Sequence, residues 1–195
     1  CEARIDLLLS ELKRSNIKVC LWKSVDRWIE GLEGKTDFDV LLEPSADFSR
    51  VYNVFVGEGW VPTSAEPWRD FKGVHNFITF EFGVPLHIHL HQQIVTGEKL
   101  VKSLRPPISH LYFKGNKFNQ KNLIIPTPEL ELLLYICRTI LKLDFIDFLG
   151  ALKRRSFKTV FRNYTNEFCL LKERSNSNRV QQLLMLDEFS ILPNK

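Results

Sequence analysis

The chain has 195 residues, 44% of them hydrophobic and 26% charged, with a formal net charge of +4, which describes an ordinary globular protein large enough to bury a core. No apolar run approaches the roughly 20 residues of a membrane span and no signal peptide opens the chain, so we expect a cytoplasmic location and no membrane partner. The four cysteines are far apart and lack Cys-x-x-Cys spacing, which argues against a cysteine zinc site or a disulfide framework.

The first thirty residues predict a helix, a strand and a second helix. Apolar residues at helical spacing indicate an amphipathic helix over residues 4–15, and the apolar run 18–22 indicates a short buried strand. Residues 25–32 are typical of a helix with Ser24 as its N-cap. A hydroxyl and free N–H groups at a helix start can bind an anion, and Lys23 adds positive charge. Lys23 and Ser24 are therefore candidate phosphate-binding residues, with simple capping by Ser24 as the alternative.

Two acidic residues interrupt the next apolar strand, in the sequence Lys35-Thr-Asp-Phe-Asp-Val-Leu-Leu42. Side chains in a strand alternate between faces, so Asp37 and Asp39 should project from the same side. Two close carboxylates repel each other and suit a cation such as Mg²⁺. Thr36, directly before the pair, is a further candidate for nucleotide binding. The alternative is an edge strand that shows two acids to water, or a turn capped by Asp37.

A helix over residues 48–57 and a strand at 60–62 follow, and then two alternating segments predict a hairpin over residues 77–82 and 86–91. With Gly83-Val-Pro85 as a three-residue loop, Phe82 would pair with Leu86. Glu81 would then lie opposite His87 and Thr79 opposite His89. One face of this hairpin would carry Thr79, Glu81, His87, His89 and His91.

The spacing of Ser24 from Asp37-Phe38-Asp39-Val40 resembles the signature of the DNA polymerase β-like nucleotidyltransferase superfamily. The likeness covers about residues 1–95 and is strongest to a bacterial branch that is sometimes fused to a kinase-like domain and found with polysaccharide biosynthesis. Lys23 stands where the signature has glycine. No Asp or Glu occurs between His87 and His91, where the superfamily has its third acid.

The resemblance implies transfer of a nucleotidyl group from an NTP to a small acceptor, with a link to surface-polysaccharide metabolism. Asp37 and Asp39 would hold Mg²⁺ or Mn²⁺, while Lys23 and Ser24 would bind the β- and γ-phosphates. The nucleophile would be assisted by His89 or Glu81. Because the glycine and the third acid are missing, the alternative is a catalytically inactive module of the same fold that binds nucleotide or a partner domain.

A separate interpretation of His87-Ile-His-Leu-His91 is a transition-metal site, since alternating histidines share one strand face and imidazole suits zinc, copper and iron. We rank it below the carboxylate site and expect no stoichiometric transition metal. Solvated histidines on an outer sheet face are the third interpretation of the same pattern.

The rest of the chain predicts a change of structural class. A short helix over 99–104, irregular chain to residue 122 and a strand at 123–125 precede Pro126-Thr-Pro128, a junction of linker and helix N-cap. From residue 129 helices are expected over 130–143, 145–153, 158–172 and 179–191. We thus predict an α+β protein with a small mixed-sheet nucleotidyltransferase-like domain, residues 1–126, and a helical bundle, residues 127–195. The basic residues of the bundle are diluted by acids and lack interleaved aromatics, so nucleic acid is not an expected partner.

Overall fold

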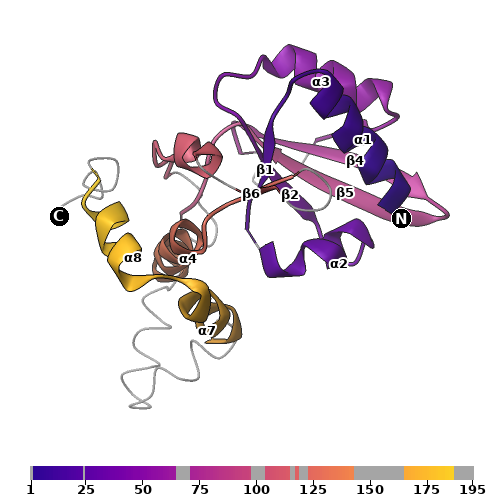
Figure 1. Cartoon of the computed structure of the whole chain (residues 1–195). Helices are drawn as coiled ribbons and strands as arrows, with labels where there is room; N and C mark the ends of the chain where they lie inside the picture. Colours follow the sequence, from indigo (N-terminus) through magenta and orange to yellow (C-terminus); the bar gives the residue numbers. More distant parts are fainter. Residues whose placement is uncertain are drawn as a thin grey trace. The chain divides into compact units, whose positions relative to one another are not determined.

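A computed structural model gives the fold of the chain (Figure 1). It describes residues 2–23, 25–64, 71–97, 104–114, 117–118, 123–142 and 165–186. Two compact units are present. The first contains residues 1–94 and 107–126, and the second contains residues 95–106 and 127–195. The sequence-based division at residue 126 did not foresee that residues 95–106 group with the second unit.

The first unit alternates helices with strands. Its helices are α1 (Glu2–Arg14), the 3₁₀ helix η1 (Val25–Arg27), α2 (Trp28–Leu32), α3 (Phe48–Gly57) and the 3₁₀ helix η3 (Ser109–Phe113). Its strands are β1 (Val19–Leu21), β2 (Phe38–Leu42), β3 (Val61–Thr63), β4 (Val74–Glu81), β5 (Val84–His91), β6 (Lys117–Phe118) and β7 (Ile124–Ile125). The predicted mixture of helix and strand is confirmed, and α3 has the predicted bounds.

The described strands form one mixed sheet of seven in the order β3-β4-β5-β2-β1-β7-β6. The two longest strands, β4 and β5, form an antiparallel hairpin, while β5 pairs with β2 in parallel. β2 is antiparallel to β1, and β1 is parallel to β7. The strand with the acidic pair therefore lies in the middle of the sheet, next to the strand with the alternating histidines.

One face of this sheet carries the hydrophobic core. Residues alternate along β2 and β5, and the apolar ones pack with residues of α1 and α3, which lie on the same side of the sheet (Figure 1). The shared cluster includes Phe38, Val40, Leu42, Leu86, Ile88 and Leu90 from the strands and Ile5, Leu8, Leu12, Val51 and Phe55 from the helices. The intervening residues of β2 and β5 consequently face the other side.

Helix α3 shows how the local sequence forms the helical layer on the core face of the sheet. Asp47 caps the helix by accepting a hydrogen bond from the Ser49 N–H at 3.0 Å. Val51 and Phe55, four residues apart on one helical face, are fully buried. The apolar spacing was readable from the sequence, which explains why the bounds of this element were predicted correctly.

The hairpin register was predicted wrongly. Phe82 and Gly83 form a two-residue turn with φ of 51° and 78°, and Glu81 pairs with Val84. His87 therefore lies opposite Ile78, and His89 opposite Asn76. Relative to the prediction the register shifts by three residues, and an odd shift moves side chains to the other face. A glycine that accepts positive φ at the second turn position favours the shorter loop over the three-residue loop.

Other differences are local. The helix predicted over residues 25–32 is divided into η1 and α2, and η3 and β6 occur where irregular chain was expected. Most of the helix predicted over residues 99–104 lies outside the described residues, and Leu104 instead forms an isolated bridge with Thr96. The helix predicted over 145–153 also lies outside them.

The described part of the second unit is mainly helical, with α4 (Pro128–Lys142), α7 (Thr165–Arg174) and α8 (Ser177–Leu184). Leu132 and Tyr135 of α4 pack against Leu171 of α7. The Glu129 side chain accepts a hydrogen bond from the Asn176 N–H at 3.0 Å, which ties the start of α4 to the start of α8. None of the described helices combines the length and the apolar character needed to cross a bilayer.

Candidate functional site

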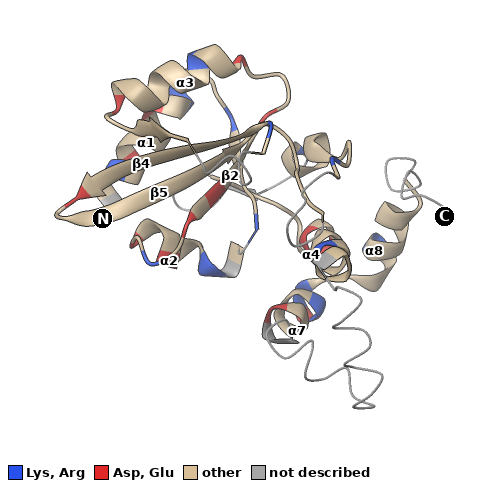
Figure 2. Ribbon diagram, turned by 180° about the vertical axis from the view of Figure 1, so that it is seen from behind, with Lys and Arg blue, Asp and Glu red and all other residues tan. Residues whose placement is uncertain are grey.

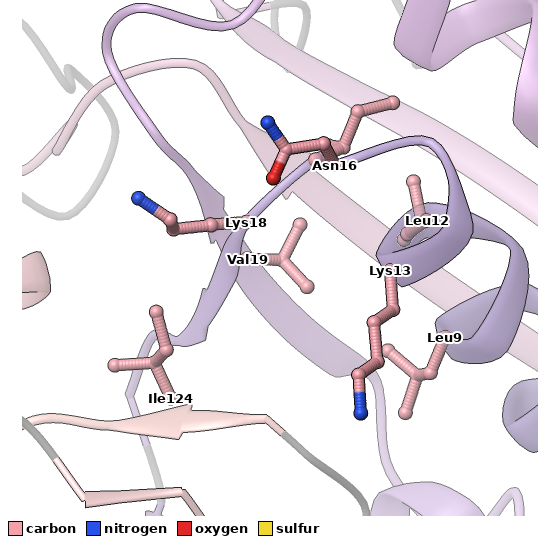
Figure 3. A pocket seen from close by; sticks show the side chains of 8 residues that line it. Leu9, Leu12, Lys13, Asn16, Lys18, Val19 and Ile124 are labelled. Carbon is pink, nitrogen blue, oxygen red and sulfur yellow. The ribbon is translucent and has the colours of Figure 1, made fainter.

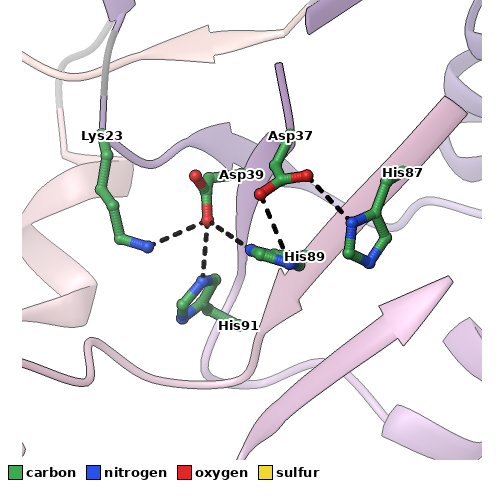
Figure 4. A network of polar contacts seen from close by, with 6 residues as sticks. All are labelled: Lys23, Asp37, Asp39, His87, His89 and His91. Atoms are coloured by element: carbon green, nitrogen blue, oxygen red, sulfur yellow. Dashed lines mark hydrogen bonds and ion pairs between the residues drawn. The ribbon is translucent and has the colours of Figure 1, made fainter. Parts of the chain in front are cut away.

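The parallel pairing of β2 with β5 brings the acidic pair beside the histidines. Asp39 and His89 are register partners, as are Phe38 and Ile88. Because Phe38 and Ile88 belong to the core face, Asp39 and His89 project from the opposite face. Figure 2 shows the acidic segment on β2 within an otherwise uncharged part of the sheet. We use the term polar cluster for the six residues drawn in Figure 4, which are Lys23, Asp37, Asp39, His87, His89 and His91.

One carboxylate oxygen receives most of the contacts in the polar cluster. Oδ1 of Asp39 lies 2.9 Å from Lys23 Nζ, 3.2 Å from His89 Nδ1 and 3.2 Å from His91 Nε2 (Figure 4). Among the described residues, no hydrogen bond or ion pair is formed at the second oxygen of Asp39, Oδ2. The Asp39 carboxylate therefore has one oxygen engaged within the protein and one available for a ligand.

The second carboxylate shares a histidine with the first. Asp37 Oδ1 lies 2.9 Å from His87 Nδ1, and Asp37 Oδ2 lies 3.9 Å from His89 Nε2. His89 thus presents Nδ1 to Asp39 and Nε2 to Asp37. As the strand alternation predicts, the two carboxylates face the same side of the sheet. An imidazole ring, rather than a third carboxylate, lies between them.

Exposure rises steadily from one end of the polar cluster to the other. The side chain of His91 is 3% exposed, those of Lys23 and Asp39 are both 17%, and those of His87 and Asp37 reach 34% and 53%. Trp22 covers the buried end, with its ring edge-on to His91 at 6.0 Å and to Tyr112 of η3 at 5.6 Å. A ligand from solvent would therefore approach at Asp37 and His87.

Burial and charge set the protonation states at the buried end of the polar cluster, around Asp39 and His91, which we call the closed end. Burial favours a higher pKa for Asp39, but the Lys23 ammonium and the hydrogen bonds from His89 and His91 hold that pKa well below its usual range. Burial lowers the pKa of His91 to about 4, the nearby Lys23 charge acts in the same direction, and Asp39 opposes both. At neutral pH Asp39 is consequently an anion, and His91 is a neutral ring that donates from Nε2.

Lys23 has an unusual backbone conformation for its residue type. Its φ is 68°, in the left-handed region that glycine enters freely and that costs other residues about 1 kcal/mol or more. The chain leaves the sheet here, just after the Trp22 N–H bonds to the Asp39 carbonyl at 3.0 Å. The Lys23 side chain turns back from this position, and its ammonium contacts Asp39.

Two groups in the polar cluster have the composition of metal sites. Asp39 with His89 and His91, and Asp37 with His87 and His89, each have three ligand atoms within 4.8 Å of one another. Carboxylate oxygens suit Mg²⁺ and Mn²⁺, whereas imidazole nitrogens suit zinc, iron and copper. The oxygen donors fit the expected Mg²⁺ or Mn²⁺, while the histidines add donors that Mg²⁺ does not prefer.

Not all of the residues singled out in the sequence reach this site. Glu81 was expected to approach from the neighbouring strand, which is wrong, because it pairs with Val84 at the hairpin tip and shares the face of Phe77 and Thr79. Thr36 precedes β2, and in the described part of the chain no hydrogen bond joins it to the polar cluster. Ser24 lies outside the described residues.

Two aromatic residues at the closed end were missed. Trp22 was treated only as part of a strand, and Tyr112 lies in a segment read as irregular. Both are about 1% exposed. The run of large apolar residues around Tyr112 was the available signal, but nothing local indicates that it packs beside His91.

The structure also has a hollow away from the polar cluster, between the end of α1, β1 and β7 (Figure 3). Its lining is mainly apolar, and Lys13 and Lys18 contribute the charged groups. None of the six residues of the polar cluster lines it, and Lys18 is already paired with Glu43 at 3.1 Å. The hollow therefore contributes nothing to the chemistry of that cluster.

Comparisons with known proteins do not identify a family. No family model matches the chain, and neither a curated protein nor a solved structure matches it. The fold and the polar cluster define a mixed α+β protein whose Asp and His groups could hold a metal ion.

Proposed function

We propose that the chain transfers a nucleotidyl group from an NTP to a small acceptor in a reaction that depends on Mg²⁺ or Mn²⁺. The observation that carries the proposal is the pairing of Asp39 with His89 across two parallel strands, with Asp37 on the same face. In this proposal His89 takes the part of the third acid of the resembling superfamily.

Asp37 and the free oxygen of Asp39 are the residues that would hold the ion. Mg²⁺ commonly uses one or two carboxylates and completes its shell with water and substrate phosphates. More than half of the Asp37 side chain is exposed, so phosphate oxygens can reach the same ion. When bound, the ion would supply charge stabilisation at the reacting phosphate.

Two further residues act on the substrates in this proposal. The acceptor hydroxyl attacks the α-phosphorus, the bond to the bridging oxygen breaks, and pyrophosphate leaves. His89 takes the acceptor proton on Nε2, since its Nδ1 hydrogen is donated to Asp39. Lys23 moves from Asp39 to the β- and γ-phosphates, where Ser24 is the second proposed ligand.

A second candidate function is nucleotide binding without turnover. Two observations favour it: Lys23 already neutralises Asp39, and an imidazole, not a third carboxylate, lies beside the two aspartates. In that case the chain would be an inactive module of the same fold that binds nucleotide or a partner domain.

Pyrophosphate release separates the two functions. Each NTP is supplied with Mg²⁺ or Mn²⁺ and a broad pool of small acceptors. Turnover should fall about a thousandfold or more in Asp39→Ala, since several kcal/mol of charge stabilisation are lost. Glu43→Gln, a carboxylate change outside the polar cluster, is the matched control and should keep full activity. Nucleotide binding without any release supports the inactive module, and absence of both rejects nucleotidyl transfer and nucleotide binding.

A further inference from the structure

We propose that Asp39, His89 and His91 form a site for one zinc-class transition-metal ion, at the closed end of the polar cluster. The inference rests on the same site as the proposed function, because Asp39 belongs to both. It goes beyond that function by assigning a nitrogen-rich position to a different class of metal. It also reverses the ranking that the sequence alone suggested for the histidines.

The donor set and its spacing support this assignment. His89 Nδ1 and His91 Nε2 each lie 3.2 Å from Asp39 Oδ1. Four-coordinate zinc with ligands at about 2.0–2.1 Å separates neighbouring ligand atoms by about 3.3 Å. A small movement of the side chains would therefore admit the ion. Two imidazoles with one carboxylate and an open position are typical of catalytic zinc and of non-haem iron.

The burial of His91 is an independent observation. It is 3% exposed, and its buried Nδ1 has no hydrogen-bond partner among the described residues. A buried imidazole with an unsatisfied nitrogen costs free energy, and the single polar contact through Nε2 compensates for only part of it. A metal bond at Nε2 would replace the contact with Asp39 and would not change Nδ1. The support for the site is that Nε2 of this buried ring faces Asp39 at 3.2 Å.

The alternative group, Asp37 with His87 and His89, is a weaker candidate for the same ion. Its His89 nitrogen is 3.9 Å from the carboxylate, and both Asp37 and His87 are substantially exposed. Exposed side chains lose more freedom when they are fixed around an ion. We therefore assign the transition metal to the buried group. An ion on His89 Nδ1 would leave the ring hydrogen on Nε2, so a chain that carries this ion could not use His89 as the base of the proposed transfer.

Lys23 is the competitor of this ion. Its ammonium lies 2.9 Å from the same oxygen that would ligate the metal, so ion binding must displace it. Removal of this charge should raise affinity for the ion at the buried group. The affinity of adventitious binding to surface histidines would not change when the Lys23 charge is removed. This difference makes the site assignment testable.

Titration of the full chain with Co²⁺, without nucleotide, tests the proposal. Co²⁺ replaces Zn²⁺ and reports its coordination through visible d–d absorption. We expect one Co²⁺ per chain with a low-symmetry, four- or five-coordinate spectrum. His91→Gln should weaken binding about a hundredfold or more, in line with the 10–100-fold losses that follow even from mutating groups behind metal ligands. Lys23→Met should tighten binding roughly tenfold or more.

His87→Gln and His75→Gln are the controls. His87 belongs only to the exposed group, and His75 lies on the core face, stacked on Phe48 at 4.0 Å. Both variants should bind Co²⁺ as the wild type does. Absence of stoichiometric Co²⁺, or a loss caused by His87→Gln but not by His91→Gln, would overturn the proposal.

Folding of each variant is checked by its thermal transition. If His91→Gln does not fold, Lys23→Met decides, since unchanged or weaker Co²⁺ binding there rejects the site. Nucleotidyl transfer is measured separately as pyrophosphate release. One bound Co²⁺ without transfer supports this inference and rejects the proposed reaction, whereas Mg²⁺-dependent transfer without a transition-metal site does the reverse.

Discussion

The two ends of the polar cluster contain the same chemical groups in very different surroundings. At the closed end Asp39 and His91 lie beneath Trp22 with Lys23 beside them, and at the open end Asp37 and His87 face solvent. Each end pairs a carboxylate with an imidazole at about hydrogen-bonding distance. Burial lowers the pKa of His91 to about 4, because it removes the water that would otherwise stabilise the charged ring. Burial acts to raise the pKa of Asp39, but the Lys23 ammonium and the hydrogen bonds from His89 and His91 hold that pKa well below its usual range.

Because of this contrast, one face of the sheet combines a fixed part with an exchangeable part. A buried, ionised Asp39 with three donors on one oxygen is held in place. An exposed Asp37 can exchange its histidine partner for water, metal or phosphate at little cost. The closed end is thus suited to hold an ion or a counter-charge, and the open end to receive a substrate.

The largest expected effect is an acid-dependent loss of stability from His91. Its folded pKa is about 4, below the ordinary value near 6.5, so between these values the unfolded chain binds a proton that the folded chain does not. Stability from this group is therefore complete above about pH 6.5 and falls by about 3 kcal/mol as the pH drops towards 4. Asp39 acts in the same direction at lower pH, since its folded pKa is also depressed.

Urea unfolding at a series of pH values measures this effect. His91→Gln removes the titrating group but keeps a donor for Asp39, so its free energy of unfolding should change less between pH 7 and 4. The readout is the difference between the two profiles. Parallel profiles would mean that His91 is not held neutral by burial.

The next largest effect is a loss of stability when Lys23, which forms an ion pair with Asp39 at the closed end, is replaced. Lys23→Met should lower the free energy of unfolding by about 2 kcal/mol. This is less than the ~3–5 kcal/mol for breaking a fully buried pair, because His89 and His91 still donate to Asp39. Chemical denaturation measures the loss.

Comparison of Lys23→Gly with Lys23→Met measures the cost of the left-handed backbone conformation at this position. It removes the same charge but relieves the positive φ, so it should recover about 1 kcal/mol relative to Lys23→Met. If glycine were no better than methionine, the left-handed conformation of Lys23 would carry no cost, and the strain argument would be wrong.

The smallest effect on stability is expected at the open end. Asp37→Asn should change the free energy of unfolding by less than about 0.5 kcal/mol, because an exposed ion pair contributes little. The same change should strongly weaken binding of Mg²⁺ with NTP, measured by calorimetry. Equal binding by the variant and the wild type would remove Asp37 from the proposed site.

The sequence by itself determined the local patterns from which the cluster is built. Alternation around Phe38 put both aspartates on one side of a strand, and alternation around Ile88 did the same for the histidines. The amphipathic helix at 48–57 was equally readable. These features repeat every two or every 3.6 residues, so each follows from a short stretch of chain.

Only the tertiary structure decided that the two strands are parallel neighbours and that Asp39 lies beside His89. Partners about 50 residues apart leave no local trace, and the hairpin register depends on a turn whose loop length was misjudged. That single shift removed Glu81 from the site. The positive φ of Lys23, the ammonium on Asp39 and the cover over His91 likewise arise from packing between distant segments, which no periodicity in the sequence encodes.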